Sequence, residues 1–256
     1  DSNGNGEVSI NDVTNTVDKI LQRIPNRFIQ KAADANMDGD ITVSDVTATI
    51  DIILERTSAP KRSNKAACVA SDDKVFIDDF KLGNGQQQTI NLQLTNTGQY
   101  TAFQCDIILP DGLKIVEDDE QTPMISISNA NAHNHVVQAN YLGNDVLRLL
   151  VMSMSNTAFS ADANNVVSLT LEANAETLGQ KVINIENVRL VDVESRTESE
   201  APDTQATVEI VDTPSGIQQM VAINDFKIRV EGHELVVVAE TDGVLRLTSM
   251  DGKQRM

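Results

Sequence analysis

The sequence has no tryptophan, two tyrosines and six phenylalanines, so aromatic residues make up only 3% of its 256 residues. Proteins that bind polysaccharides usually stack sugar rings on the flat faces of exposed aromatic side chains. Besides the phenylalanines, only Tyr100 and Tyr141 could provide such a face for a sugar ring. The composition disfavours a carbohydrate-binding surface and leaves it as an alternative that would use one of these tyrosines.

No stretch of the chain is apolar for the roughly 20 residues that a membrane-spanning helix requires, and no signal peptide is visible. The sequence therefore predicts no transmembrane segment. Basic residues are also scarce, because 20 Lys and Arg stand against 38 Asp and Glu and give a formal net charge of -18. Nucleic acid is bound by basic surfaces, so it is not an expected partner.

Only two cysteines are present. Cys105 alternates with Phe103 and Ile107, so it is expected to point into a core as a small apolar residue. Cys68 could pair with it in an oxidising compartment if their strands are adjacent. The other reading, two buried free thiols, is the safer one.

Catalytic patterns are lacking too. No nucleophile elbow, phosphate loop or zinc-ligand spacing occurs, and the run Asp118, Asp119 and Glu120 is typical of a solvated loop. His133 and His135 could bind a metal from one face of a strand. Exposed turn residues are the favoured interpretation because no third ligand is near in sequence. We therefore predict a protein that is not an enzyme.

What the chain does have is a twelve-residue pattern that occurs twice, 33 residues apart, beginning at Asp1 and at Asp34. Both copies place oxygen-bearing residues at loop positions 1, 3, 5, 7, 9 and 12 and glycine at position 6, which is the layout of a calcium loop. Ca²⁺ prefers six to eight oxygen ligands, and glycine permits the sharp turn. The predicted metal-binding residues are Asp1, Asn3, Asn5, Glu7, Ser9 and Asp12, and Asp34, Asn36, Asp38, Asp40, Thr42 and Asp45.

The roles within each loop follow from this layout. In the first loop Asp1, Asn3, Asn5 and Asp12 would bind through their side chains, Glu7 through its backbone carbonyl and Ser9 through water. The second loop would use its residues in the same way, with Asp40 and Thr42 in the lesser roles. Two Ca²⁺ ions are therefore predicted, and an ordinary Asp/Asn/Gly turn is the less favoured reading.

After each loop, apolar residues recur at helical spacing, for example Val13, Val17 and Ile20. No residues precede Asp1 to form a helix before the first loop, and the segment from Pro25 to Ala33 is too short and broken for a good helix before the second. A duplicated loop with only an exiting helix, closed by Asp at position 12, resembles the dockerin type I repeat. The resemblance covers residues 1–57 and implies a docking module whose partner is a cohesin-type protein module, in trans or within the same chain.

Dockerins typically meet their partner through fixed loop and helix positions. On this sequence those positions are Ile10, Asn11, Val17, Asp18 and Gln22, and Val43, Ser44, Ile50, Asp51 and Glu55. Val17 and Ile50 could instead pack the two helices together. The internal two-fold symmetry could let either helix dominate binding, or could be only the trace of a duplication.

After a polar linker at 58–66, the pattern changes to short alternating strands separated by turns rich in Gly, Asn and Asp. About ten strands at this spacing predict an antiparallel β-sandwich over 67–211. The expected strands are 68–70, 74–81, 88–95, 102–109, 124–128, 136–141, 146–154, 166–173, 181–191 and 206–211.

Parts of this region resemble the cohesin fold and its carbohydrate-binding relatives. The segments that carry the resemblance are 88–97, with the sequence QTINLQLTNT, 100–113, with YTAFQCDIILPDGL, and the later pair 146–153 and 166–173. The resemblance rests on hydrophobic alternation, so it implies the fold more than the partner.

The last part of the chain, 212–256, predicts a small β module, a three-stranded meander with strands at 226–230, 234–239 and 244–249. It resembles the start of the C-terminal sorting domain of Bacteroidetes secretion substrates, on Ser215-Gly216-Ile217 and on the turn at Met250-Asp251-Gly252-Lys253. A small β-appendage that covers a sheet edge is the other reading.

Taken together, the sequence predicts a multidomain protein with a small helical dockerin-like module, a cohesin-like antiparallel β-sandwich and a short β-meander. The expected function is calcium-dependent protein–protein docking or adhesion by a non-catalytic protein, secreted or on the outer cell surface. A carbohydrate-binding accessory protein of a polysaccharide-degrading system is the alternative. Because the numbering begins on a predicted metal ligand, we expect a longer precursor with a leader.

Overall fold

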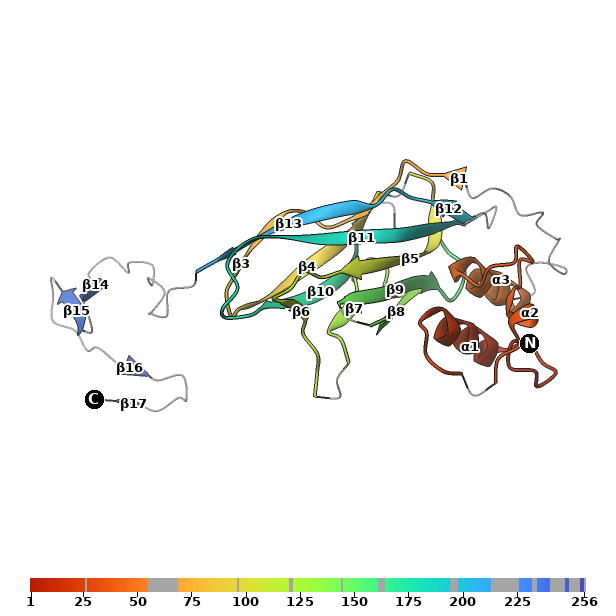
Figure 1. The fold of residues 1–256 in the computed structure, drawn as a ribbon, viewed down its shortest axis with the longest axis horizontal. Coiled ribbons are helices and arrows are strands. Elements are labelled where there is room, and N and C mark those ends of the chain that lie inside the picture. The colour runs from red at the N-terminus through yellow and green to blue at the C-terminus, as the bar shows by residue number, and fades with distance from the viewer. Residues whose placement is uncertain are drawn as a thin grey trace. The chain divides into compact units, whose positions relative to one another are not determined.

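The computed structural model describes 1–54 and 69–212, apart from short gaps at 26, 96, 120–121, 144, 161–163 and 194–197, and beyond 212 only four strands. Residues Asp1–Asp212 form one compact unit and Thr213–Met256 a second (Figure 1). Cys68, Glu55, the linker 58–66 and the Ser215–Ile217 segment lie outside the described residues.

The N-terminal part of the first unit, which we call the head (residues 1–54), has two long helices and one short one. Helices α1 (Ile10–Ile20) and α3 (Val43–Ile53) each follow one predicted loop, and α2 (Gln30–Ala33) is a single turn before the second loop. Ser9 and Thr42 cap the two long helices, and each forms a capping box with the aspartate three residues later. The helices that the apolar spacing predicts are therefore confirmed.

The rest of the first unit is a two-sheet β-sandwich. The larger sheet has the order β1-β12-β11-β5-β9-β8, and β3 and β13 extend it beside the long strand β11. Its strands are β1 (Val69–Ala70), β3 (Phe80–Gly83), β5 (Tyr100–Ile108), β8 (His135–Tyr141), β9 (Val146–Ser153), β11 (Gly179–Asp192), β12 (Glu198–Glu200) and β13 (Thr204–Val211).

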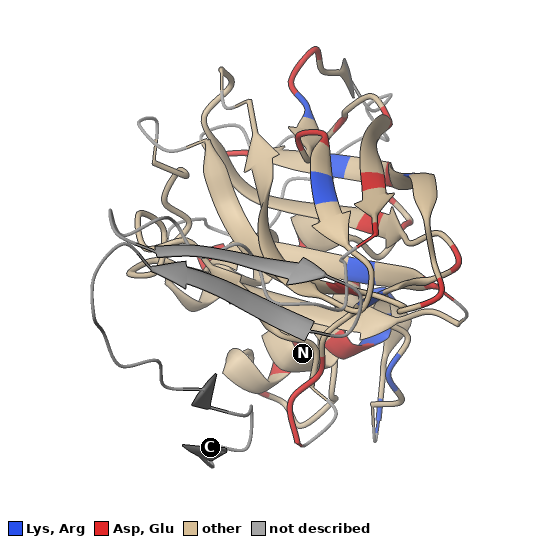
Figure 2. Cartoon of the chain, turned by 90° about the vertical axis from the view of Figure 1, so that its left-hand side faces the viewer, with Lys and Arg blue, Asp and Glu red and all other residues tan. Residues whose placement is uncertain are grey.

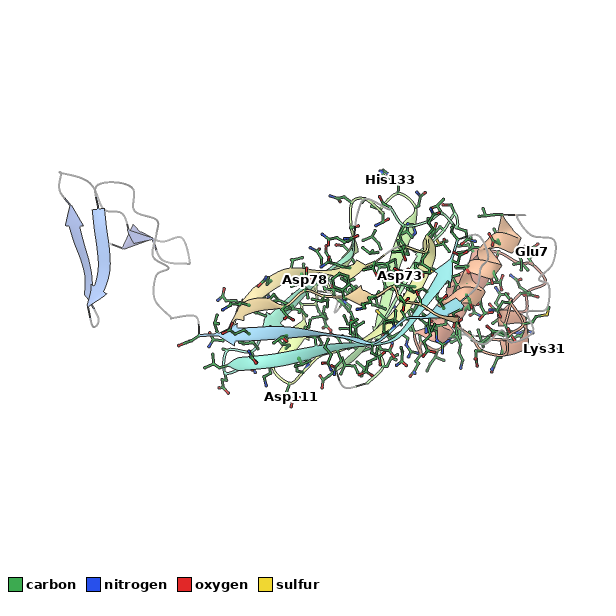
Figure 3. The ribbon with its side chains drawn as sticks, turned by 90° about the horizontal axis from the view of Figure 1, so that it is seen from above. Glu7, Lys31, Asp73, Asp78, Asp111 and His133 are labelled. Atoms are coloured by element: carbon green, nitrogen blue, oxygen red, sulfur yellow. The ribbon has the colours of Figure 1, made fainter. Side chains whose placement is uncertain are left out.

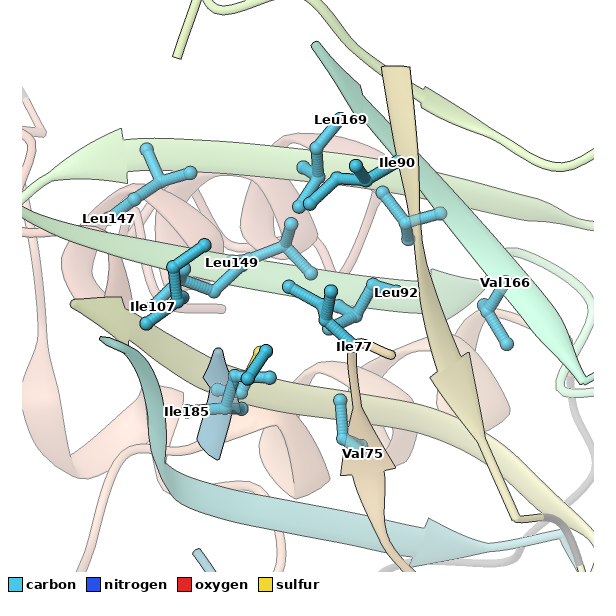
Figure 4. Close-up of a cluster of buried hydrophobic side chains, with 14 of the residues drawn as sticks. Val75, Ile77, Ile90, Leu92, Ile107, Leu147, Leu149, Val166, Leu169 and Ile185 are labelled. Atoms are coloured by element: carbon cyan, nitrogen blue, oxygen red, sulfur yellow. The ribbon is translucent and has the colours of Figure 1, made fainter. Parts of the chain in front are cut away.

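The smaller sheet has the order β2-β4-β10-β6, with β7 also paired to β10. Its strands are β2 (Val75–Phe76), β4 (Gln87–Leu94), β6 (Leu113–Ile115), β7 (Ile125–Ile127) and β10 (Asn165–Ala173). Leu92, Leu149, Leu169 and Ile185 are among the side chains that fill the space between the sheets (Figure 4).

The predicted sandwich needs three corrections. The pairs β1–β12 and β3–β13 are parallel, so the sheet is not wholly antiparallel. Strands β6 and β12 were not predicted, because three-residue strands give too little alternation to detect. The expected strand 74–81 is divided into β2 and β3.

In the second unit, β14 (Phe226–Glu231) pairs with β15 (Glu234–Ala239), and β16 (Leu247–Thr248) pairs with β17 (Gln254–Arg255). The predicted three-stranded meander is therefore wrong in its pairing. The third strand is two residues long and pairs with a segment beyond it, not with the hairpin.

One face of the larger sheet differs from an ordinary solvent-facing surface. Every residue of β5 from Tyr100 to Ile107 is buried, and so are the last five residues of β9. Alternate residues of a strand point to opposite faces, so both faces of these two strands are covered. The sandwich core covers one face, and the head covers the other.

Candidate functional site

The two predicted calcium loops share one pattern of internal hydrogen bonds. The carboxylate of Asp1 accepts backbone N–H bonds from Asn5 and Gly6 at 2.9 and 3.1 Å, and Asp34 accepts the equivalent bonds at 3.0 and 3.1 Å. Gly6 and Gly39 have φ values of +95° and +99°, a region that a Cβ would strain. The two loops therefore share one backbone turn, over which the carboxylate at position 1 lies (Figure 3 labels Glu7 of the first loop).

The aspartate at position 12 closes each loop and joins it to a helix. Asp12 accepts from the backbone N–H of Asn3 at 3.1 Å and of Ser9 at 2.9 Å. Asp45 accepts from the backbone N–H of Asn36 at 3.2 Å and of Thr42 at 2.9 Å, the equivalent positions. The same carboxylate therefore caps the helix and faces the loop, so loop and helix are mechanically coupled.

The electrostatics of the two loops differ. The pKa of Asp45 is raised to about 7, mainly by burial and also by the nearby carboxylates of Asp38 and Asp34, against backbone hydrogen bonds that lower it. In the first loop Asn5 stands where the second has Asp38. There burial also acts to raise the pKa of Asp12, but backbone hydrogen bonds from Ser9 and Asn3 outweigh it, so the pKa is lowered. A cation in the second loop would therefore offset the larger repulsion between carboxylates.

The donor set fits calcium better than a softer metal. The predicted ligands are carboxylate, amide, hydroxyl and carbonyl oxygens, which hard cations prefer. Within the described part of the chain, no three His, Cys, Asp or Glu side chains gather at one point where they could hold a metal. A bound ion would therefore depend on amide, backbone and water oxygens as well as carboxylates, which is usual for Ca²⁺ and unusual for Zn²⁺.

The head packs on the outer face of the larger sheet (Figure 1). We call this part of the sheet the docking face and define it by the outward side chains of Ala102, Gln104, Asp106, Asn140, Arg148, Leu150, Met152 and Val191. The head contributes apolar side chains from both long helices to a shared buried cluster with four of these residues. The head members are Val13, Val17, Ile20, Leu21, Val43, Val46 and Ile50.

The docking face also provides hydrogen bonds to the ends of the two helices. The backbone N–H of Val43, the first residue of α3, donates to Gln104 Oε1 at 3.2 Å. At the other helix, Asn140 Nδ2 donates to the carbonyl of Leu21 at 2.9 Å, and Arg148 Nη1 to that of Ile20 at 3.5 Å. Helix ends carry backbone groups without partners inside the helix, so the sheet completes them.

A second set of contacts holds the middle of α3. Asn156 lies just beyond β9 with a φ of +49° and is 3% exposed. Its Nδ2 donates to the carbonyl of Thr47 at 3.0 Å and to Asp51 Oδ1 at 2.6 Å. One asparagine of the sandwich therefore binds two consecutive turns of α3.

Polar groups at the rim fix the orientation of the head. Arg148 forms two 2.7 Å bonds to the carboxylate of Asp106, which is 4% exposed and also accepts from Asn187. Arg23 of the head donates to the carbonyl of Ala139 at 2.7 Å. At the far end of the interface, Thr42 donates to Glu198 at 2.5 Å.

The predicted partner residues of the two repeats occupy different environments. Val43, Ser44, Ile50 and Asp51 of the second repeat are 0–2% exposed, and the bonds with Gln104 and Asn156 involve their helix. In the first repeat Val17 is buried in the shared cluster and Asp18 is partly buried beside Arg23. Ile10, Asn11 and Gln22 are exposed.

The sandwich side of this interface was not among the predicted partner residues. A signal existed in β9, where Leu149, Leu150, Val151 and Met152 form a continuous apolar run. Such a run is typical of a strand that is buried on both faces. Asn156 gave no signal, because its role depends on a turn that only the folded chain brings to α3.

Two predictions about single residues are wrong. His135 is not an exposed turn residue; it begins β8 and is 4% exposed, whereas His133 does lie in an exposed loop (Figure 3). Tyr100 is 6% exposed, and its hydroxyl donates to Asp73 at 2.9 Å, so its ring cannot stack on a sugar. Tyr141 is partly buried against the core.

The prediction for Cys105 is confirmed. Its side chain is 1% exposed in the core, and burial raises the pKa of its thiol. It is a free thiol, with no described cysteine beside it.

No family model and no curated protein matches this chain. Solved structures that are similar to it are cohesin modules. The seventh ScaB type I cohesin from Pseudobacteroides cellulosolvens is 11% identical with a TM-score of 0.46, over 57% of this chain and 97% of that one. A non-cellulosomal cohesin from the archaeon Archaeoglobus fulgidus is 8% identical with a TM-score of 0.45, over 56% and 93%.

A third similar structure comes from a type I cohesin–dockerin complex of Clostridium thermocellum. It is 13% identical with a TM-score of 0.44, over 55% of this chain and 100% of that one. The similarities concern the fold of about half of this chain.

Proposed function

We propose that this chain is a non-catalytic docking protein in which a calcium-stabilised helical head binds a β-sandwich, here the sandwich of its own chain. The observation that carries the proposal is the interface itself. An apolar cluster shared by both helices and the docking face is surrounded by side-chain bonds to the ends and the middle of the helices. This combination of an apolar centre and a polar rim is typical of a specific protein–protein interface.

Calcium would act on the head, not on the sandwich. The aspartate at position 12 of each loop caps the following helix, so a cation bound there would neutralise its charge and fix the helix orientation. Because α3 carries most contacts to the docking face, loss of calcium is expected to weaken docking as well as the head.

A secreted or cell-surface location agrees with calcium loops, since free calcium is abundant outside cells. Among the residues that the structure describes, no helix is long and apolar enough to cross a membrane. Acidic side chains are spread over the loops and strands of the sandwich, with few basic ones between them (Figure 2). The C-terminal β module is proposed to be a partial sorting signal, on the sequence resemblance alone.

The test uses the full chain and its own methionines. Met152 is 1% exposed under the head, whereas Met124 is 48% exposed elsewhere on the sandwich. Peroxide oxidation, read by peptide mass spectrometry, should modify Met152 far more slowly than Met124 in millimolar calcium. The two rates should approach each other in excess chelator. Equal rates in calcium would refute docking, and an unchanged ratio in chelator would refute its dependence on calcium.

A further inference from the structure

A buried histidine, His135, begins strand β8 of the sandwich. The imidazole of His135 stacks on the ring of Phe159, with centroids 4.1 Å apart and planes 20° from parallel. The side chain is 4% exposed, and neither ring nitrogen makes a hydrogen bond of ordinary geometry, although backbone oxygens lie near the ring. Buried polar groups are usually hydrogen-bonded, so burying this imidazole costs free energy. A charged ring would cost much more, so the buried imidazole is neutral.

The segment that covers His135 is the one that holds α3. We call Ser153–Phe159 the latch segment. It begins where β9 ends, contains Asn156, and ends at the phenylalanine on which the imidazole stacks. The hydrogen bond from the Thr157 N–H to Ser153 Oγ, at 2.9 Å, folds the segment back on itself. A change at His135 is therefore transmitted through a few residues to the bonds with Thr47 and Asp51.

We propose that His135 makes docking of the head sensitive to acid: a proton on its imidazole opens the latch segment and frees Asn156 from α3. This inference rests on the proposed docking function and adds its regulation. Water can solvate the charged ring when the segment is open and cannot reach it when the segment is closed. Head release and histidine exposure then favour each other, as linked equilibria must.

The surroundings of the ring compensate a proton only in part, through backbone oxygens and no charged group. The groups that face it are backbone oxygens of Asn131, Thr101 and Thr157 and the ring of Phe159. No carboxylate or cation among the described residues acts on it. Burial lowers the pKa of His135 from its usual 6.5 to about 4, partly offset by the backbone oxygens. The next ionisable group toward the head is Asp51, bonded to Asn156.

The direction and size of the effect follow from these values. The folded pKa lies below the unfolded one, so the closed state binds fewer protons and loses stability as the pH falls through 6.5 toward 4. Between pH 7.5 and pH 5.0 the population of the open state should rise about 30-fold if release restores the ordinary pKa.

The experiment compares oxidation of Met152 relative to Met124 at pH 7.5 and pH 5.0, in excess calcium, in the full chain. The wild type should show a rise of about 30-fold. His135→Phe keeps the stacking on Phe159 without a titratable group, and His135→Asn is a second neutral variant if the first folds poorly. Both should abolish most of the rise. His133→Asn, in the exposed loop beside it, is the matched control and should behave as the wild type.

The outcomes are distinct. An unchanged ratio in the wild type between the two pH values overturns the inference, and so does an equal rise in the His135 variants. Met152 as reactive as Met124 already at pH 7.5 would instead show that the head is not docked, which is a failure of the proposed function. Titration of Asp45 in the same range affects all variants alike and therefore does not alter the comparison.

Discussion

Replacement of Asn156 by alanine tests the interface at its most specific contact. The side chain donates to a neutral carbonyl, that of Thr47, and to the carboxylate of Asp51. A neutral hydrogen bond contributes about 1 kcal/mol and one to a charged group about 2 kcal/mol, so the variant should weaken docking by about 3 kcal/mol. That corresponds to a rise of about 100-fold in head release.

The positive φ of Asn156 requires a matched control. At +49°, alanine is strained by about 1–2 kcal/mol, whereas glycine is not. This strain is present whether or not the head is docked, so it should lower the free energy of unfolding of the sandwich in Asn156→Ala and not in Asn156→Gly. The loss of hydrogen bonds should be the same in both.

The assay is therefore peroxide oxidation of Met152 relative to Met124 for both variants, with urea unfolding alongside. Both should raise the oxidation ratio by about 100-fold, and Asp51→Asn should raise it less, because its amide oxygen can still accept. A ratio within twofold of wild type in both variants would refute the assignment of Asn156 to docking. A rise in the alanine variant alone would also contradict the assignment, because the glycine variant loses the same hydrogen bonds.

Three further predictions follow. Titration calorimetry should find two calcium sites, and Asp1→Ala or Asp34→Ala should each remove one. Of the two variants, only Asp34→Ala should raise Met152 oxidation strongly. Two remaining sites in either variant would contradict the ligand sets. In chelator, the head should lose up to about 4 kcal/mol of stability as the pH rises from 4 to 7, because the pKa of Asp45 is raised from 3.8 to about 7 in the folded state. Urea unfolding followed by helical circular dichroism would measure this loss. A stability that rises with pH would disprove it. Arg148→Met should lower the free energy of unfolding by about 3–5 kcal/mol, because it leaves the buried carboxylate of Asp106 without its cation. Arg148→Met combined with Asp106→Leu should recover much of this stability in thermal unfolding. A double variant no more stable than the single one would contradict the prediction.

Much of the local structure could be predicted from the sequence, because it depends on neighbours along the chain. The capping aspartates Asp12 and Asp45 and the apolar spacing after them determine both long helices. The alternation Phe103, Cys105, Ile107 gave the inward face of β5. Short strands such as β12 were missed because their three residues are positioned by pairing with β11, not by their own pattern.

The larger omission concerned the outer side of the sheet. Gln104 and Asp106 on β5 and Arg148 on the adjacent strand β9 are polar, as residues on an ordinary solvent-facing surface would be. Only the placement of α1 and α3 shows that they complete helix ends and form a buried ion pair. His135 is a similar case, since its burial depends on Phe159, which reaches it from the other side of β9.

The sequence by itself determined the two oxygen-rich loops, the helices that follow them and the class of the sandwich, since each depends on residues a few positions apart. Both long helices pack on the sheet, and only the tertiary structure shows that, within the described residues, the start and the middle of α3 are also hydrogen-bonded to the sandwich. The two repeats have nearly the same side chains at the predicted contact positions, and no local rule distinguishes Val43 and Asp51 from Ile10 and Asp18. Asn156, Gln104 and Glu198 make the two repeats differ, because their hydrogen-bond partners on the head are all in the second repeat.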